Sequence, residues 1–280
     1  MSFIWIANPK DGLNITQSLS EKIDKTQLFI SSVEKSSKQG VCHLCGKPEV
    51  SREHTPSKAA FNKKDLLVLK VAKPLQRFLR WILEFQQGGN VAHTLCKECN
   101  NLSGAWYNSA YVKLARACSK YSNTNTAGQK VDVKCSTYPF RIVKQALIHV
   151  VSSSQSGLTE CVPILREFLK NKEQRIENPP FRIGLYIRAN TGARYTGLAC
   201  GINIQQEEID ILSEFSFWPL GWVLAFEGTS LGDLCDVTSW MNLDYHDKQN
   251  IDLTVPCHWA IQAYPKDFRS PAEFREIKVS

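Results

Sequence analysis

The sequence has no run of about 18 apolar residues, the length that a membrane-spanning helix needs. Its first residues, MSFIWIANPKDG, show no basic segment followed by an apolar stretch, so we expect no secretory signal peptide. Internal repeats and low-complexity tracts are also lacking. These absences argue against a membrane protein and favour a globular protein of the cytoplasm.

Charge of one sign is only mildly in excess. The net charge is +7, from 34 Lys and Arg against 27 Asp and Glu. Such an excess suits a polyanionic partner without requiring one. With 280 residues, of which 43% are hydrophobic and 22% charged, the chain is long enough to bury a good core.

Cysteine, in contrast, is abundant, with ten in the chain. Disulfides rarely persist in the reducing cytosol, so closely paired cysteines there indicate a metal site before a disulfide. Two Cys-x-x-Cys pairs are present, Cys42 with Cys45 and Cys96 with Cys99. The other six stand singly among apolar residues, and we interpret them as small buried hydrophobic side chains: Cys118, Cys135, Cys161, Cys200, Cys235 and Cys257.

The two pairs are typical of the two halves of a zinc knuckle. Four thiolates give Zn²⁺ a closed tetrahedral shell, which is the structural form of a zinc site. Gly46 follows the first pair and allows a tight turn around an ion. The 50 residues between the pairs (46–95) exceed the compact spacing of small zinc modules, so chance pairing in a cysteine-rich chain is the alternative.

An acidic residue and a histidine stand side by side between these pairs, as Glu53 and His54, with Pro56 two residues later. Histidine is the natural general base near neutral pH, and a carboxylate is a suitable hard ligand for Mg²⁺ or Mn²⁺. Neighbours in a strand point to opposite faces, so a bend is needed to bring both side chains to one phosphate. The alternative is a surface pair in a turn that the proline ends.

These three elements in this order resemble the HNH endonuclease family, the ββα-metal nucleases. The resemblance covers Val41 to Tyr121, less than a third of the chain. It implies that His54 is the general base and that Glu53 and Asn100 hold one divalent cation, Mg²⁺ or Mn²⁺. It also implies an asparagine that orients the loop of the catalytic histidine, for which Asn90 is the candidate and His93 and Asn101 are substitutes. Asn100 is expected near the first turn of a helix that follows Cys99 and offers unpaired N–H groups to an anion.

Basic residues between the pairs are the candidate contacts with nucleic acid. From Lys58 to Arg80 they occur with Asp65 as the one acid among them, and such a surface neutralises phosphates without reading the base sequence. The alternative is a solvated face of an amphipathic helix predicted over Pro74–Phe85. The residues that we select are Lys58, Lys63, Lys64, Arg77 and Arg80.

The pattern of apolar residues predicts an α+β protein in three parts. A preamble, 1–38, carries a helix over Gln17–Glu34. A zinc-braced ββα-metal module, 39–125, carries a strand at Leu66–Val71, the helix at Pro74–Phe85 and a helix from Leu102 to Tyr121. A third part, 130–280, is a mostly antiparallel β unit with flanking helices. Its predicted helices are Pro139–Val150 and Val162–Leu169, and its predicted strands are Phe181–Ile187, Arg194–Ile204, Phe215–Phe226 and Ile251–Ile261.

The third part shows no comparable chemistry. His149 lies inside an apolar helix and is interpreted as a core histidine, and the aromatic residues around Phe215 and Trp222 are interpreted as core before base-stacking residues. A role in recognising a target, a partner or an activating signal is left for it.

The sequence therefore predicts a metal-dependent endonuclease that hydrolyses phosphodiester bonds of DNA, with double-stranded DNA as its partner. The resemblance suggests a place in bacterial antiphage defence or in a mobile element. The alternative is a non-catalytic four-cysteine zinc module that binds nucleic acid or protein. Convergence of His54, Glu53 and Asn100 on one point separates the two.

Overall fold

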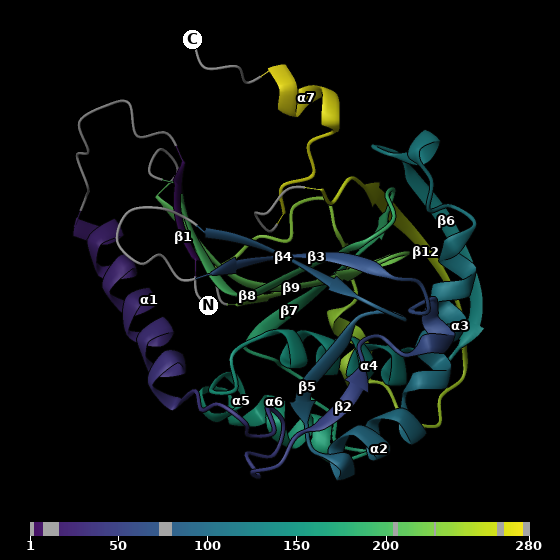
Figure 1. Cartoon of the computed structure of the whole chain (residues 1–280), viewed down its shortest axis with the longest axis horizontal. Helices are drawn as coiled ribbons and strands as arrows, with labels where there is room; N and C mark the ends of the chain where they lie inside the picture. Colours follow the sequence, from purple (N-terminus) through teal and green to yellow (C-terminus); the bar gives the residue numbers. More distant parts are fainter. Residues whose placement is uncertain are drawn as a thin grey trace.

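The computed structural model describes residues 3–7, 17–72, 80–203, 207–226, 228–261 and 266–276. These residues form a mixed α+β fold in which one large curled sheet carries helices on its faces and a small ββα unit to one side (Figure 1). The α+β class predicted from the sequence is confirmed.

Within the described residues, eight strands join in the large sheet, seven of them in one path. Most neighbours run antiparallel, as predicted, but β1 is parallel to β8 and β12 is parallel to β7. In order across the sheet the strands are β1 (Phe3–Ala7), β8 (Ala193–Asn203), β9 (Glu208–Phe217), β10 (Leu220–Phe226), β7 (Phe181–Arg188), β12 (Gln249–His258) and β6 (Lys130–Thr137), with the short β11 (Cys235–Asp236) paired to β7.

Helix α4 (Pro139–Ser153) lies between this sheet and the ββα unit. Pro139 occupies its first turn, where the missing N–H costs nothing. The helix contacts β8, β9 and β10 on one side and β5 (Val91–Leu95), α2 (Lys97–Trp106) and α3 (Asn108–Ser119) on the other, so it is buried almost all round. The other α-helices of the described residues are α1 (Gln17–Ser36), α5 (Leu158–Cys161), α6 (Pro163–Lys170) and α7 (Pro271–Glu276).

The ββα unit consists of the antiparallel pair β2 (Ser51–His54) and β5 (Val91–Leu95), followed by α2 (Lys97–Trp106). Helix α2 contacts both strands. Between β2 and β5 the chain forms a second antiparallel pair, β3 (Leu66–Ala72) with β4 (Arg80–Gln86). Two strands and a helix therefore stand in the order that the resemblance implied.

Three predicted elements differ in the structure. The helix over Pro74–Phe85 is wrong from Arg80 onward, where β4 pairs with β3; positions 73–79 lie outside the described residues. Short apolar runs fit both helical and strand periods, and here Trp81, Ile82 and Phe85 favoured a strand. The single helix from Leu102 to Tyr121 is two helices, α2 and α3. The predicted strand Phe215–Phe226 is the end of β9 and the whole of β10, with a turn at Trp218-Pro219 between them.

The hydrophobic core is continuous across the predicted boundary at 125–130. One cluster of buried side chains includes Leu44 and Leu95 beside the cysteines, Leu114 in α3, and Phe140 and Trp222 in the third part. The ββα unit is therefore packed onto the large sheet through α4. Among the described helices, none combines the length and the apolar character that crossing a membrane requires.

Candidate metal centre and the Glu53-His54 site

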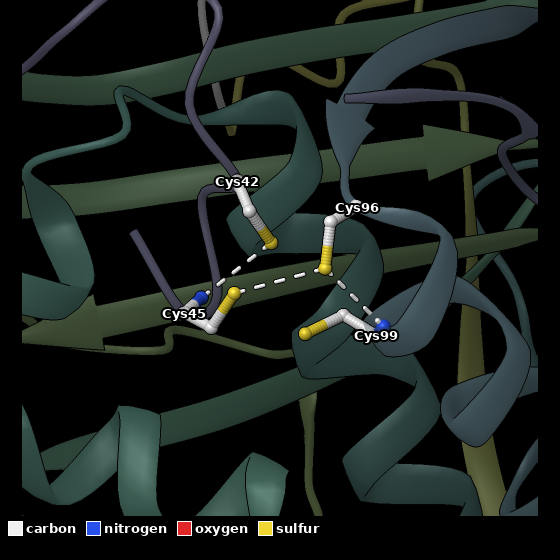
Figure 2. A group of neighbouring side chains, drawn as sticks. All are labelled: Cys42, Cys45, Cys96 and Cys99. Atoms are coloured by element: carbon white, nitrogen blue, oxygen red, sulfur yellow. Dashed lines mark hydrogen bonds between the residues drawn. The ribbon is translucent and has the colours of Figure 1, made fainter. Parts of the chain in front are cut away.

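The four cysteines of the two predicted pairs lie together in a cluster that could hold a metal ion (Figure 2). All four sulfur atoms lie within 4.8 Å of one another, and Cys45 Sγ is 3.7 Å from Cys96 Sγ. Zinc–sulfur bonds of about 2.3 Å in a tetrahedron place the sulfurs about 3.8 Å apart. The donor set and its spacing therefore fit a structural zinc.

The two halves of the cluster repeat one local geometry. The amide of Cys45 faces Cys42 Sγ at 3.5 Å, and the amide of Cys99 faces Cys96 Sγ at 3.5 Å. Gly46 turns the first half with a φ of 76° and donates its N–H to the carbonyl of Cys42. In the second half Cys96 is the N-cap of α2, so the helix itself supplies the turn.

The thiols influence one another strongly. A hydrogen bond with Cys99, together with backbone amides, lowers the pKa of Cys42 to about 4 against the opposing effect of burial. The same contact with Cys42, and then burial, raises the pKa of Cys99. A bound Zn²⁺ supplies the positive charge that lets all four ligands be thiolates.

The first half of the cluster is tied to three elements beyond itself. The amide of His43 donates to the carbonyl of Thr94 in β5 at 2.7 Å, and His43 Nδ1 lies 3.2 Å from the carbonyl of Val151 in α4. The hydroxyl of Thr159 in α5 donates to the carbonyl of His43 at 2.5 Å. The cluster thus joins the ββα unit to the helices under the large sheet.

Glu53 and His54 end strand β2, and the register of β2 against β5 shifts just before them, between Ser51 and Glu53. A register shift of this kind changes the direction in which side chains point. It occurs where a bend is needed to bring the Glu53 and His54 side chains to one phosphate. The carboxyl of Glu53 is buried and accepts hydrogen bonds from the hydroxyls of Thr94 at 2.5 Å and Ser152 at 3.4 Å. Burial raises the pKa of Glu53 to about 7, although both hydroxyls lower it.

His54 is partly buried, and its Nδ1 is buried without a hydrogen-bond partner in the described part of the chain. Burial lowers the pKa of His54, and the positive charges of Lys58 and Arg52 lower it further. The imidazole is therefore neutral near pH 7, which is the form that a general base needs.

Asn90 lies where β5 begins and holds the chain just after His54. Its Nδ2 donates to the carbonyl of Thr55 at 2.6 Å, while the amide of Thr55 donates to the carbonyl of Asn90 at 3.3 Å. The Asn90 side chain is buried. The residue expected to orient the loop of the catalytic histidine thus makes a direct contact with that loop.

Asn100 lies near the first turn of its helix, as the sequence predicted, although that helix begins earlier than expected. Helix α2 begins before Cys99, at Lys97, and the amide of Asn100 already donates to the carbonyl of Cys96 at 3.0 Å. The amide of Asn100 is therefore not one of the unpaired N–H groups expected at the start of the helix, because the cap lies at Cys96. Asn100 is half-buried on a helix that contacts β2 and β5, while the substitutes His93 and Asn101 are exposed.

The predicted nucleic-acid contacts divide into two groups. Lys58, Lys63 and Lys64 are exposed in the segment between His54 and β3. Arg80 is the first residue of β4, paired in register with Ala72, and Arg77 lies outside the described residues. The expected face of a helix is absent at Arg80, since that residue belongs to a strand.

The sequence did not single out Thr94, Ser152 or the cavity between α1 and β9. Thr94 lies two positions before Cys96 in a strand, and Ser152 is distant in sequence, so only the packing of α4 reveals their contact with Glu53. The cavity has a volume of about 640 Å³. None of the predicted site residues lines it.

Comparison of the chain with protein-family models, with curated proteins and with solved structures gave no match.

Proposed function

We propose that the protein is a metal-dependent endonuclease of the HNH type, which hydrolyses phosphodiester bonds of DNA. The observation that carries the proposal is the end of β2. There a neutral histidine with an unpartnered buried ring nitrogen follows a buried carboxyl, and Asn90 ties the next residue to β5. A buried polar atom without a partner costs about 1–3 kcal/mol, and such a cost is often found where function requires it.

In this proposal His54 takes a proton from a water molecule, whose oxygen attacks the phosphorus. The bond from phosphorus to the 3′ oxygen breaks, leaving a 5′-phosphate. Glu53 and Asn100 provide a carboxylate and an amide oxygen, a donor set that fits Mg²⁺ or Mn²⁺. The cation supplies charge stabilisation at the scissile phosphate and at the departing oxygen.

The four-cysteine cluster has a structural role in this proposal. Zinc bound there holds the loop before β2 against the start of α2, and so fixes two of the three elements that carry the site. The exposed Lys58, Lys63 and Lys64 provide charge for the phosphates of the duplex on either side of the cut. Antiphage defence or a mobile element is the proposed biological setting.

The test is nicking of supercoiled plasmid with Mg²⁺ or Mn²⁺, by wild type, His54→Ala and His246→Ala. His246 is an exposed histidine far from His54 in sequence, with its Nε2 3.8 Å from Glu173 Oε1, and serves as the matched control. We expect the wild type and His246→Ala to nick at equal rates, and His54→Ala to lose at least about 100-fold, in the range that a general base contributes. Equal rates for His54→Ala and wild type would remove His54 from the mechanism.

One observation favours a second function, a non-catalytic zinc module that binds nucleic acid. The Glu53 carboxyl is already engaged by Thr94 and Ser152 inside the protein, as a structural carboxyl would be. In that case the wild type retards DNA in a gel without cutting it under any divalent cation. The variant His54→Ala then retards DNA equally.

A further inference from the structure

We propose that Asn62 is a positioning residue for this site, which fixes the loop after His54 to the start of β5 and closes the base of the β3–β4 hairpin. The inference rests on the proposed function for its effect on catalysis. Its structural part is independent of that function.

The side-chain amide of Asn62 is fully buried and uses both its nitrogen and its oxygen. Nδ2 donates to the carbonyl of Pro56 at 2.6 Å and to the carbonyl of Asn90 at 2.8 Å. Oδ1 accepts from the amide of Asn90 at 2.6 Å. Asn90 in turn donates through its own side chain to Thr55. We call these four hydrogen bonds the Asn62–Asn90 clasp.

The backbone beside the clasp is shaped to allow it. Gly89 has a φ of 108°, and a Cβ built there would lie 2.4 Å from Asn62 Oδ1 and 2.5 Å from the Asn62 carbonyl oxygen. Only a glycine permits so close an approach of the two chain segments. One residue earlier, the amide of Gly88 donates to Asp65 Oδ1 at 2.7 Å, which adds a second tie across the base of the hairpin.

The clasp acts on His54 through the backbone. Thr55 and Pro56 are the two residues that follow His54, and the clasp holds the carbonyls of both. The side chain of Asn62 bonds to Pro56 and to Asn90, one on each side of the hairpin base. Asn62 therefore positions the backbone that follows His54, the proposed general base, and does not itself contact the substrate.

Lys63 and Lys64 come directly after Asn62 and are exposed. Loss of the clasp should lower kcat and leave the KM for DNA nearly unchanged, because the charges that bind phosphate remain. Misplacement of a reacting group by about 1 Å costs on the order of 100-fold in rate.

The kinetic test uses full-length Asn62→Ala, Asn62→Asp and Asn90→Ala, and the double variant Asn62→Ala with Asn90→Ala. Asn190→Ala is the control, because its amide oxygen accepts from the amide of Ala260, which follows β12 and is far from the hairpin in sequence. We expect kcat to fall 10- to 100-fold in the first three variants, with KM within twofold and zinc content unchanged. The double variant should be no slower than the slower single variant, since both belong to one clasp.

Hydrogen exchange of the backbone amides provides the arm that needs no activity. Asn62→Ala should speed exchange of the Asn90 amide at least tenfold, whereas Asn62→Asp keeps an acceptor and should preserve its protection. If the exchange changes as expected but neither the wild type nor any variant cleaves DNA, the nuclease proposal is wrong, and the structural role of the Asn62–Asn90 clasp is confirmed. Cleavage at the wild-type kcat by Asn62→Ala would overturn the positioning role, as would loss of zinc and global unfolding in both Asn62 variants.

Discussion

His149 is fully buried in α4, stacked on Phe215 at 4.9 Å between ring centroids and edge-on to Tyr111 at 4.9 Å. Its ring nitrogen Nε2 lies 3.3 Å from Gln145 Nε2. The interpretation as a core histidine is confirmed, as is the burial of Phe215 and Trp222. The sequence alone predicted the burial of His149, because its neighbours along the helix are apolar and side chains on an apolar helix face are buried together.

This burial has a consequence for acid stability. Burial lowers the pKa of His149 to about 3, from about 6.5 in an unfolded chain. The folded state keeps the ring neutral, while the unfolded state takes up a proton as the pH falls. The contribution of His149 to the free energy of unfolding is therefore complete above pH 6.5 and is lost as the pH falls toward 3. The loss approaches about 1.4 kcal/mol per pH unit.

We therefore expect His149→Phe, which keeps a ring in place, to weaken the dependence of the unfolding free energy on pH between 6 and 4. Urea unfolding at several pH values measures the slope. His246→Phe, at an exposed position, should leave the slope as in the wild type. A slope in His149→Phe equal to that of the wild type would show that His149 is not the group responsible.

At the scale of elements, the sequence indicated a strand that ends at Glu53-His54 and a helix after the second cysteine pair, because both are marked locally, but it carried no local mark for β5. Cysteine spacing marks the start of α2, and the Glu53-His54 pair marks the end of β2. The β3–β4 hairpin was mistaken for a helix because its apolar residues also fit a helical period. Asn62 was missed for a different reason: its partners Pro56 and Asn90 are brought together only by the hairpin, and a lone asparagine carries no signal of that.

The second half of the cluster is the element whose loss is easiest to test. Cys96→Ser keeps an oxygen that can cap α2 by accepting from the amide of Cys99, but removes one thiolate from the metal shell. We expect loss of zinc and a fall in the unfolding free energy of more than about 4 kcal/mol, because binding energy in such sites is folding energy. Metal analysis and thermal unfolding measure the two effects.

Cys161→Ser is the matched control for that experiment, since Cys161 is a half-buried single cysteine outside the cluster, with contacts to Ser32 and Ser36. It should keep its zinc and unfold within a few degrees of the wild type. A Cys96→Ser protein as stable as Cys161→Ser would contradict the structural role of the cluster.

At the scale of the whole molecule, α4 joins the parts. Its end at Val151–Ser154 contacts His43 beside the cysteines, the carboxyl of Glu53, and Ser213 in β9 of the large sheet. The sequence predicted β7, β8 and β12, and one run that covers β10 and the end of β9, but it missed β6. It also did not predict the order of the strands, because β1 from the N-terminus and β12 from the C-terminal region enter the sheet as parallel neighbours. Such pairings between distant segments leave no local pattern.

We propose that two metals have separate tasks: zinc in the cysteine cluster holds the fold, and a second divalent cation works with His54. The direct measurement is plasmid nicking by protein that has been dialysed briefly against EDTA, with zinc content measured in parallel. We expect one zinc to remain per chain, nicking to be lost, and added Mg²⁺ or Mn²⁺ to restore it in the wild type but not in His54→Ala, which should hold its zinc equally. Nicking that survives the dialysis, or that returns only with Zn²⁺, would contradict the claim.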